Sequence, residues 1–502
     1  MLFRRIACVL LAVLLLVPAG AMAEGETFTL AGFDDTSMRQ WENNRFFARM
    51  HEWTGVDFTF RQSTDLQSWN QWKAALTKDS KDLPDVLFKA ALTNTECVEL
   101  RANGTLIDLK PLLEANAPHA WAVLQEQPDV LDAITLPDGS IAALPYINTL
   151  PSQNYIWINR QWLETLRLET PVSAEDLVTV LTAFKTRDPN RNGKNDEIPL
   201  GFLGPFDLKF LAHAFGMICN DYNLFVDEQG QARFMPLEEN YRMFVTWCRD
   251  LYSAGLLDPN GFSTADTLRK VTDDKALPLY GAILTTNPAN LFKTSWADQY
   301  TPLAPLMYEG KQIYRDFFGP VQTGTFAITS ACRDPEKILA WVDILYTEEG
   351  AKLTAAGQEN LDYLVDGDGT WRLVDTAQSN ASLFVANSLM DGGASMPGIA
   401  AADFIRRFSG QSQNQLENME KQTQMRVFCV RPFPYVYLTK AQEEEIAPLQ
   451  NKIGLLVDLQ LARWVLGEEE ITDASFEKFE QDLNDAGLSA FLSFWQGVLE
   501  SK

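Results

Sequence analysis

The feature that most constrains the fold is an alternation of strand-like and helix-like segments that begins close to the N-terminus. Residues 27–30 alternate apolar and polar side chains as a strand does, and residues 38–53 carry apolar side chains at helical spacing. Residues 56–60 and 84–88 are again strand-like, and a helix-like segment around 69–76 separates them. Strand, helix, strand, helix and strand in succession predict a parallel sheet covered by helices, which is an α/β fold.

A second α/β region is predicted further along the chain. Residues 155–159 are strand-like, and residues 173–176 (Ser-Ala-Glu-Asp) have the pattern of a capping box that begins a helix. Residues 334–335 mark another helix start, with aspartate as the N-cap and proline at the first helical position. Helices at 455–466 and 476–499 make the C-terminal region helical. Because no Pro/Gly/Ser-rich linker separates these segments, we expect interleaved domains.

The N-terminal residues have the order of a secretory signal peptide. Arg4 and Arg5 precede an apolar run at 6–17, and Ala21-Met22-Ala23 provides small residues at a cleavage site before Glu24. The alternative is an uncleaved membrane anchor, but a spanning helix needs about 20 apolar residues. We therefore expect residues 1–23 to be a signal peptide and the protein to be exported.

The composition excludes nucleic-acid binding, and the positions of the His and Cys residues argue against a transition-metal site. The chain has 42 Lys and Arg against 67 Asp and Glu, a net charge of −25, whereas nucleic acid and anionic lipid attract basic surfaces. Its three histidines lack metal-ligand spacing. The cysteines after residue 23 are odd in number and scattered, which favours isolated thiols over a disulfide framework and leaves one bridge open; they are Cys97, Cys219, Cys248, Cys332 and Cys429.

Residues 188–197 (Asp-Pro-Asn-Arg-Asn-Gly-Lys-Asn-Asp-Glu) carry the strongest local signal for chemistry. Oxygen-bearing side chains alternate along the segment, a glycine follows where a loop must turn, and two acids close the run. Ca²⁺ takes six to eight oxygen ligands of these kinds. The first six positions match an EF-hand loop, but the twelfth is Pro199 where an EF-hand has glutamate. The predicted ligands are Asp188, Asn190, Asn192, the carbonyl oxygen of Lys194, Asp196 and Glu197; the alternative is a solvated Asn/Gly turn.

The same loop carries a resemblance to a known family. Residues 188–199 match the pattern Asp-Pro-Asn-x-Asn-Gly-x-x-Asp-Glu-Ile-Pro of extracellular solute-binding proteins of family 1, the receptors of ABC sugar importers. The match is with the branch that binds oligosaccharides and alginate and holds calcium in this loop. Further segments agree in the same order: 52–56 (Glu-Trp-Thr-Gly-Val), 83–86 (Leu-Pro-Asp-Val), 104–109 (Gly-Thr-Leu-Ile-Asp-Leu), 138–145, 162–166 (Trp-Leu-Glu-Thr-Leu) and 254–258 (Ala-Gly-Leu-Leu-Asp).

The resemblance implies a two-lobed periplasmic-binding-protein fold of type II, with hinge strands and a helical C-terminal region. We expect residues 24–150 and about 285–330 in the N-terminal lobe, and residues 151–284 and about 331–502 in the C-terminal lobe. It also implies a receptor, not an enzyme, that captures an oligosaccharide in the cleft and delivers it to an ABC permease. We expect a monomer with structural Ca²⁺.

Ligand contacts are predicted from position in this fold. Open parallel sheets bind ligands where their strands end, and the first strand is followed by two acids. On the family template, residues 152–155 cross between the lobes, and Trp296 lies where a sugar-stacking aromatic is often placed. Aromatic rings cover the C–H faces of sugars, while acids and amides bind the hydroxyls. The candidate residues are Asp34, Asp35, Ser152, Gln153, Asn154, Tyr155, Phe206, Trp296, Phe317 and Phe318.

Two other functions stay open. A secreted glycoside hydrolase needs two carboxylates about 5–9 Å apart, and an acidic chain offers many candidates. Against it, the chain lacks eight evident strand–helix units and motifs such as G-x-S-x-G. A receptor could also take a peptide or another small polar solute. Cys8 lies at the start of the apolar run, whereas lipoproteins have a cysteine at its end. A lipid anchor is therefore not evident, and we expect a periplasmic, extracellular or cell-surface protein.

Overall fold

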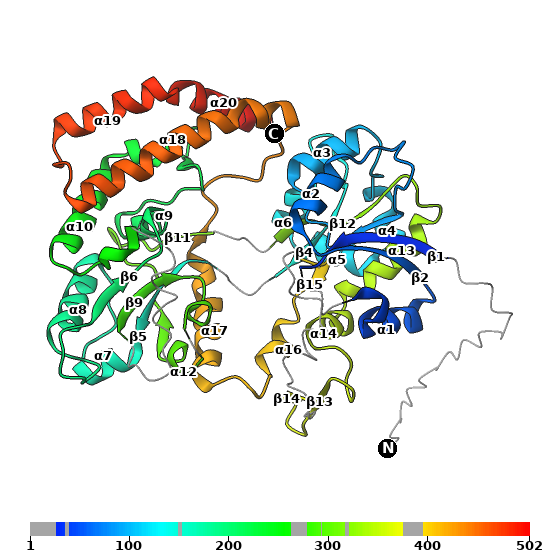
Figure 1. Ribbon diagram of the computed structural model, residues 1–502, viewed down its shortest axis with the longest axis horizontal. Helices are drawn as coiled ribbons and strands as arrows, with labels where there is room; N and C mark the ends of the chain where they lie inside the picture. Colours follow the sequence, from blue (N-terminus) through cyan, green and yellow to red (C-terminus); the bar gives the residue numbers. More distant parts are fainter. Residues whose placement is uncertain are drawn as a thin grey trace, which may run out of the picture.

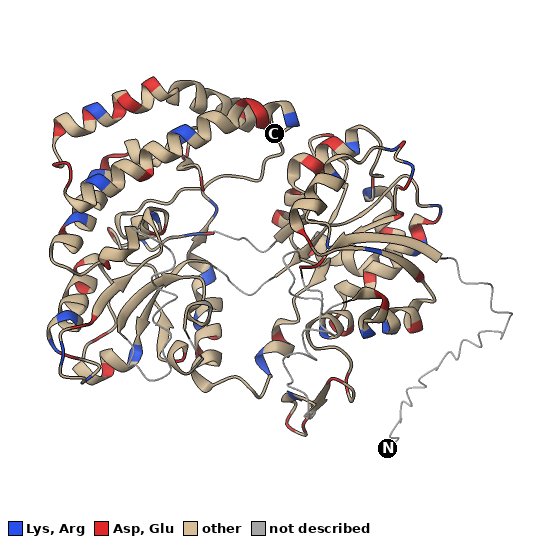
Figure 2. Cartoon of the chain, viewed as in Figure 1, with Lys and Arg blue, Asp and Glu red and all other residues tan. Residues whose placement is uncertain are grey.

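The computed structural model describes residues 27–35, 40–148, 153–262, 279–292, 294–316, 321–374 and 395–501. The predicted signal peptide lies outside these residues. The described chain forms two α/β halves that stand side by side, each with its own sheet, and a layer of C-terminal helices lies along one of them (Figure 1). Acidic and basic residues are scattered over both halves (Figure 2).

The first half is built on a six-stranded sheet with the order β15-β4-β12-β3-β1-β2. β1 pairs in parallel with both β2 and β3, which confirms the parallel arrangement predicted for the first three strands. β12 runs antiparallel to β3 and β4. The strands are β1 (Thr27–Phe33), β2 (Asp57–Ser63), β3 (Val86–Phe88), β4 (Leu144–Ile147), β12 (Val321–Ile328) and β15 (Gly398–Ile399).

Helices cover both faces of this sheet. α1 begins after Asn44, whose side chain accepts a hydrogen bond from the backbone N–H of Phe46, and it ends at Gly55 with a left-handed φ of 67°. The helix expected from residue 38 therefore starts later, at Arg45. The helices are α1 (Arg45–Thr54), α2 (Leu66–Ala74), α3 (Asn94–Ala102), α4 (Lys110–Asn116), α5 (Pro118–Glu126), α6 (Pro128–Ile134), α13 (Pro335–Asp343) and α14 (Glu348–Ala356).

The core of the first half draws on a distant part of the sequence. Phe46 and Phe88 on α1 and β3 pack against Trp341 of α13, which is only 1% exposed. α13 begins as the sequence predicted, with Asp334 as its N-cap and Pro335 in its first turn. The family resemblance predicts residues from about 331 onward in the C-terminal lobe, but α13 packs under the first sheet. The lobe limits stay a prediction.

The second half has a four-stranded sheet with the order β10-β5-β9-β6. β5 pairs antiparallel with β9 and β10, and only β6 and β9 are parallel, so this sheet is mixed. The capping box predicted before the helix at 174 is present between Ser173 and Asp176. The elements are β5 (Tyr155–Asn159), β6 (Ile198–Gly201), β9 (Tyr280–Thr285), β10 (Tyr300–Pro302), α7 (Arg160–Leu166), α8 (Ala174–Thr186), α9 (Pro205–Leu208) and α10 (Glu239–Ser253).

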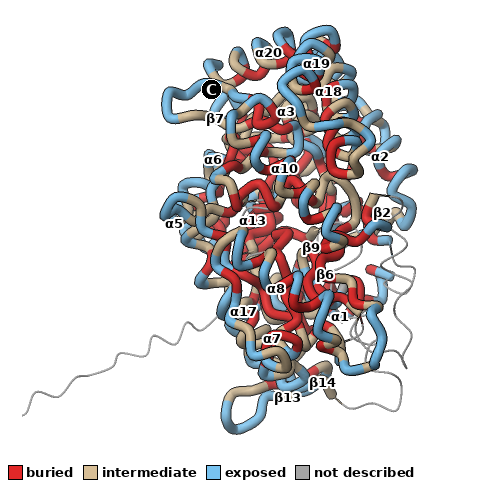
Figure 3. The backbone as a smooth tube through the Cα atoms, turned by 90° about the vertical axis from the view of Figure 1, so that its left-hand side faces the viewer, coloured by how far each residue is buried: buried red, intermediate tan, exposed pale blue. Residues whose placement is uncertain are grey.

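Three C-terminal helices, α18 (Lys440–Leu466), α19 (Asp473–Ala486) and α20 (Leu488–Glu500), cover the second half. They confirm the predicted helical C-terminal region, but the segment 476–499 is divided at Gly487, whose φ is 106°. Figure 3 shows buried residues concentrated in the interior and exposed ones on these outer helices. All five cysteines predicted as isolated thiols lie in the described part, and none of them forms a disulfide bond there.

The chain crosses between the halves several times. It leaves the first sheet at the end of β4 and enters the second at β5, and it returns between β11 (Tyr314–Arg315) and β12. β11 pairs in parallel with β16 (Cys429–Val430). After β16, Phe433 packs in the core of the second half whereas Tyr435 packs against the core of the first. These crossings place the carboxyl ends of β1, β3 and β4 toward the second half (Figure 1).

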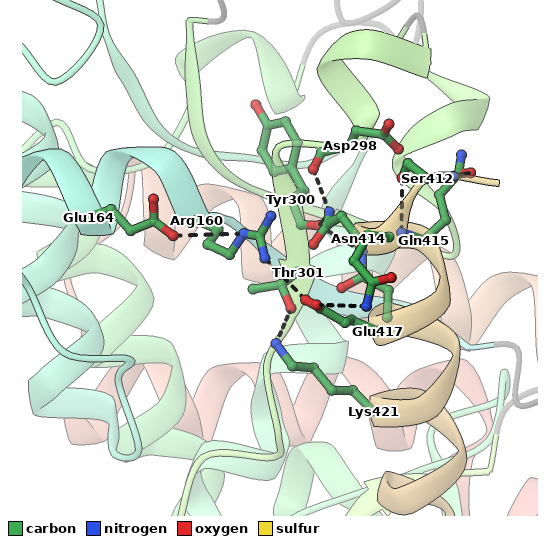
Figure 4. Close-up of polar contacts among 12 residues, drawn as sticks. Arg160, Glu164, Asp298, Tyr300, Thr301, Ser412, Asn414, Gln415, Glu417 and Lys421 are labelled. Atoms are coloured by element: carbon green, nitrogen blue, oxygen red, sulfur yellow. Dashed lines mark hydrogen bonds and ion pairs between the residues drawn. The ribbon is translucent and has the colours of Figure 1, made fainter.

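Helix α17 (Gln413–Met425) seals the edge of the second sheet with polar side chains (Figure 4). The amides of Asn414 and Asn418 both donate to the carbonyl oxygen of Tyr300 in edge strand β10, at 3.1 and 2.8 Å. Lys421 donates to the Thr301 hydroxyl at 2.7 Å. A covered edge needs such partners because an unpaired carbonyl is costly once buried.

Removing both amides should therefore cost more than the sum of the single changes. Either Asn414→Ala or Asn418→Ala leaves the Tyr300 carbonyl one donor, and we expect a loss of about 1 kcal/mol for each. The double variant leaves the Tyr300 carbonyl without a side-chain donor. Its free energy of unfolding, measured in urea, should fall by about 3 kcal/mol or more. Glu420→Ala, on the exposed face of α17, should stay within about 0.5 kcal/mol. Additive single effects would contradict the shared acceptor.

Candidate functional site

A buried ion pair supports the carboxyl end of β1. Asp34 and Lys89 are both 0% exposed, and Lys89 Nζ lies 3.3 Å from Asp34 Oδ2. The indole N–H of Trp41 donates to the same oxygen at 3.5 Å. Asp35, the next residue, is exposed. Of the two predicted acids, Asp34 thus serves the framework of this edge, and Asp35 is the one that solvent reaches.

The turn after β3 is held in an unusual backbone conformation. Lys89 and Ala91 have φ values of 49° and 48°, in the left-handed region that non-glycine residues rarely adopt. The carbonyl of Ala90 accepts a hydrogen bond from the Trp69 indole at 2.8 Å, and the Lys73 ammonium donates to the carbonyl of Ala91. Strained backbone of this kind clusters at binding sites. No pattern in the sequence marks these residues, because neither is a glycine or an asparagine.

The first residues of the second half bring polar groups together. Gln153 is 3% exposed, and its amide donates to Cys429 Sγ at 3.5 Å. The amide N–H of Asn154 donates to Asp207 Oδ1 at 2.8 Å, whereas its own oxygen is buried and unpartnered in the described structure. The Tyr155 hydroxyl is also buried without a hydrogen-bond partner in the described structure. Burial raises the pKa of Tyr155. The Asn154 oxygen and the Tyr155 hydroxyl are thus two buried polar atoms without a partner in the described structure, at the point where the chain enters β5.

An aromatic cluster adjoins these residues through α9. Phe206 and Phe210 meet edge to face, with ring centroids 5.5 Å apart. Lys209 Nζ stands 5.5 Å from the centroid of Phe206, and the Arg315 guanidinium stands 5.4 Å from that of Phe210. Burial raises the pKa of Asp207, which lies between Phe206 and Lys209 in sequence and also accepts from the backbone N–H of Leu203.

Of the remaining predicted contacts, Trp296 is in the described part of the chain. Trp296 lies on α12 (Thr294–Ala297) and packs, half-buried, against an aromatic cluster that includes Phe292 and Tyr300. Ser152, Phe317 and Phe318 lie outside the described residues. The structure therefore groups Gln153, Asn154, Tyr155 and Phe206 on the second half, whereas Asp34 and Asp35 lie on the first half at the carboxyl end of β1.

The predicted calcium loop connects α8 to β6 and is folded by its own oxygens. Asp188 Oδ1 and Oδ2 accept from the backbone N–H groups of Asn192 and Gly193, each at 3.0 Å. Asn192 Oδ1 accepts from the Lys194 N–H at 2.7 Å, and Asn192 donates its amide to Asp196 Oδ1 at 2.8 Å. Gly193 has a φ of 74°, which explains the glycine at this turn. The loop is therefore a curled ring of carboxylate and amide oxygens.

Glu197 is the residue in this loop whose buried carboxylate a bound cation would stabilise. Both of its carboxylate oxygens are buried without a hydrogen-bond partner in the described structure. Burial, with Asp188 and Asp196 close by, raises the pKa of Glu197. Among the described residues, no group of three or more His, Cys, Asp and Glu side chains has the arrangement of a metal site. The donors here include amides and a carbonyl, which suit a hard cation such as Ca²⁺.

Another segment rich in Asp and Gly, at 366–369, is a hairpin turn. It joins β13 (Tyr363–Val365) to β14 (Trp371–Leu373). The backbone N–H of Asp366 donates to the Thr370 carbonyl at 2.7 Å, and Asp368 accepts from the Thr370 N–H and hydroxyl. The Asp368 carboxylate thus closes the turn, and the Asp366 carboxylate lies 3.6 Å from Arg372 Nε.

Comparison with known proteins identifies the fold. No family model matches the chain. It is 25% identical over 480 residues to FusA of Streptococcus pneumoniae serotype 4, a fructooligosaccharide ABC transporter substrate-binding protein, covering 89% of this chain and 85% of FusA. The structure superposes on an HMO-binding, ABC-transporter-associated solute-binding protein from Bifidobacterium longum infantis with a TM-score of 0.77, at 19% identity over 95% of this chain and 99% of the other.

Two further similar structures concern calcium or an EF-hand. The alginate-binding protein AlgQ2, solved without calcium ion, superposes with a TM-score of 0.64 at 20% identity, over 94% of this chain and 98% of AlgQ2. FusA has been solved as an EF-hand mutant bound to fructo-nystose. The predicted resemblance to solute-binding receptors of ABC sugar importers and the predicted two-lobed α/β fold are confirmed.

Proposed function

We propose that this chain, which is similar over most of its length to substrate-binding proteins of ABC transporters, is an exported receptor for an oligosaccharide. It captures the sugar between its two halves and delivers it to an ABC permease. The observation that carries the proposal is the 25% identity to FusA over 480 residues, which spans both halves and the helical C-terminus.

The geometry supports a binding site between the halves. The crossing segments leave the first sheet at its carboxyl edge, where parallel strands bind ligands. The unpartnered oxygen of Asn154 and hydroxyl of Tyr155 lie directly after one crossing. Sugar hydroxyls can supply the missing donors and acceptors, and chain segments at a hinge let the halves close on a ligand.

We assign the candidate residues three roles. Asp35, Gln153, Asn154 and Tyr155 bind sugar hydroxyls. Phe206 and Trp296 offer ring faces to the C–H faces of the sugar, and we retain Ser152, Phe317 and Phe318 beside them. Asp34 acts with Lys89 to hold the carboxyl edge of β1 in place.

We propose that the loop at 188–197 holds Ca²⁺ in a structural role. Asp188, Asn190, Asn192, the Lys194 carbonyl, Asp196 and Glu197 would be its ligands. Bound calcium would supply positive charge to the buried carboxylate of Glu197, whose two oxygens have no other partner in the described structure. The loop lies between α8 and β6, so the ion would stabilise the second half without contacting the sugar.

The right oligosaccharide should raise the melting temperature and compact the molecule. Ligand at 100 times its Kd stabilises the native state by about 2.7 kcal/mol, because it binds only the folded protein. A thermal-shift screen over fructans, mannosides, uronides and peptides identifies the class, and small-angle scattering then measures the radius of gyration with and without the best ligand. A shift with peptides and none with sugars would replace the proposed ligand class.

Two controls separate this site from general stabilisation. Asn154→Ala should weaken binding about tenfold, because it removes one buried hydrogen-bonding group. Glu480→Ala, exposed on α19, should leave the affinity unchanged. Sustained release of reducing sugar from the same panel would favour the glycoside hydrolase instead of a receptor.

We also propose export and two lobes centred on the two sheets. The comparison proteins are substrate-binding proteins of ABC transporters, which fits a periplasmic or cell-surface location. None of the described helices has both the length and the apolar character needed to cross a membrane. The packing of α13 under the first sheet favours a first lobe that includes residues 335–343.

A further inference from the structure

A polar pocket lies on the first half where the end of α1 meets α14 and the loop after it. Its volume is about 470 Å³, within the range of about 300–1,000 Å³ that is usual for small-molecule sites. Its lining includes Arg49, Trp53, Lys352, Gln358, Asn360 and Tyr363.

This pocket is remote from the interlobe site. Trp53 ends α1 just before β2 starts, so it lies near the amino edge of the first sheet. Asp34 follows β1 at the carboxyl edge. β1 and β2 are parallel and seven residues long, and at about 3.3 Å per residue the two edges are roughly 20 Å apart. None of the candidate interlobe residues lines the pocket.

Trp53 is unusual among the tryptophans of this half. Trp41 and Trp341 are each 1% exposed and form the core, whereas Trp53 is 38% exposed. The guanidinium of Arg49 stands 4.9 Å from its ring centroid and pairs with Glu52 at 2.5 Å. A large aromatic ring is therefore presented beside a cavity, held by a neighbour on its own helix.

The opposite wall is a rigid loop. The backbone N–H of Gln358 donates to Asp362 Oδ2 at 2.8 Å, and that of Asn360 donates to the Tyr363 carbonyl at 2.7 Å. Arg45 of α1 pairs with Asp362 at 2.6 Å and so ties the loop to the helix that carries Trp53. The loop thus presents two side-chain amides, Gln358 and Asn360, from a fixed backbone.

The combination of groups selects a sugar. An aromatic ring packs against the C–H face of a sugar ring, and an amide both donates to and accepts from hydroxyls. The charged side chains of the pocket balance, with Arg49 and Lys352 against Glu349 and Glu359, so they favour a neutral ligand. Two of them are already paired, Arg49 with Glu52 and Lys352 with Glu348.

We propose that this pocket is a second saccharide-binding site, which takes one or two neutral sugar residues of a glycan chain outside the interlobe site. Binding there holds the receptor on a polymeric glycan and raises the local concentration of fragments that the interlobe site can capture. The site stands on its own residues and does not depend on the identity of the transported sugar.

Affinity electrophoresis in native gels tests the site with inulin, mannan and hydroxyethylcellulose as probes. At least one polysaccharide should retard the wild-type chain. Trp53→Ala should lower the association constant about tenfold, and Gln358→Ala should lower it less. Leu66→Ala, an equally exposed apolar residue on α2, should migrate as the wild type does.

The controls separate this site from the interlobe one. Melting curves check that each variant is folded. Asn154→Ala should be retarded as strongly as wild type, because its residue lies in the other site. No retardation by any probe would overturn the proposal, as would retardation that Trp53→Ala leaves intact or Asn154→Ala removes. Thermal shifts with short oligosaccharides report on the interlobe site separately, so either proposal can fail alone.

Discussion

Chelation of calcium should lower the melting temperature of this protein by about 5–10 °C. Calcium at 100 times its Kd stabilises the native state by about 2.7 kcal/mol, and each kcal/mol shifts the melting temperature of a large domain by about 2–4 °C. The physical reason is Glu197, whose buried carboxylate oxygens have no partner in the described structure. Melting in EDTA and after addition of excess Ca²⁺ measures the effect, which should reverse fully.

A pair of variants identifies the loop responsible. Glu197→Gln removes the buried charge, so the variant should show little difference between EDTA and Ca²⁺. Asp366→Ala changes the other Asp-Gly turn, which closes a hairpin with its own hydrogen bonds, and this variant should respond as the wild type does. A wild-type melt that EDTA leaves unchanged would rule out calcium in the loop at 188–197.

Replacing Lys89 by methionine should cost about 3–5 kcal/mol of unfolding free energy. Lys89 and Asp34 are both 0% exposed, and removing one partner leaves the other charge buried without its counter-ion. Urea unfolding measures the loss. Lys478→Met breaks an exposed pair with Asp482 on α19 and should stay within about 0.5 kcal/mol.

The double variant Asp34→Leu/Lys89→Met tests the cause. If the loss comes from an uncompensated charge, removing both charges should recover most of the stability. If the double variant is as unstable as the sum of the single variants, the two residues act independently and the pair is not the support of this edge. The two outcomes also bear on binding, since Asp34 directly precedes Asp35 in the chain.

Much of the secondary structure could be predicted from local sequence patterns at helix ends. The capping box at Ser173 and Asp176 and the aspartate–proline start at 334–335 both appear as predicted. They could be predicted because a helix end is satisfied by side chains within three or four residues. The calcium-like loop is similar, since its oxygens fold the loop on themselves.

The candidate site was only partly open to prediction. Asp34, Gln153, Asn154 and Tyr155 were named from their positions, but Asp34 proved to be a buried partner of Lys89. Lys89 and Ala91 were missed because their left-handed backbone is imposed by contacts from other elements, such as Trp69. No short-range pattern encodes such a conformation in a lysine or an alanine.

The sequence by itself determined several helix starts, the alternation of strands and helices in the first sheet and the family that the chain resembles, because these depend on neighbours along the chain. Only the tertiary structure decided that α13 joins the first core, that the second sheet is mixed, and that Trp341 is buried while Trp53 lines a pocket. The two tryptophans look alike in sequence, since both lie on amphipathic helices. Their exposure is set by which distant element covers them, and that is a property of packing.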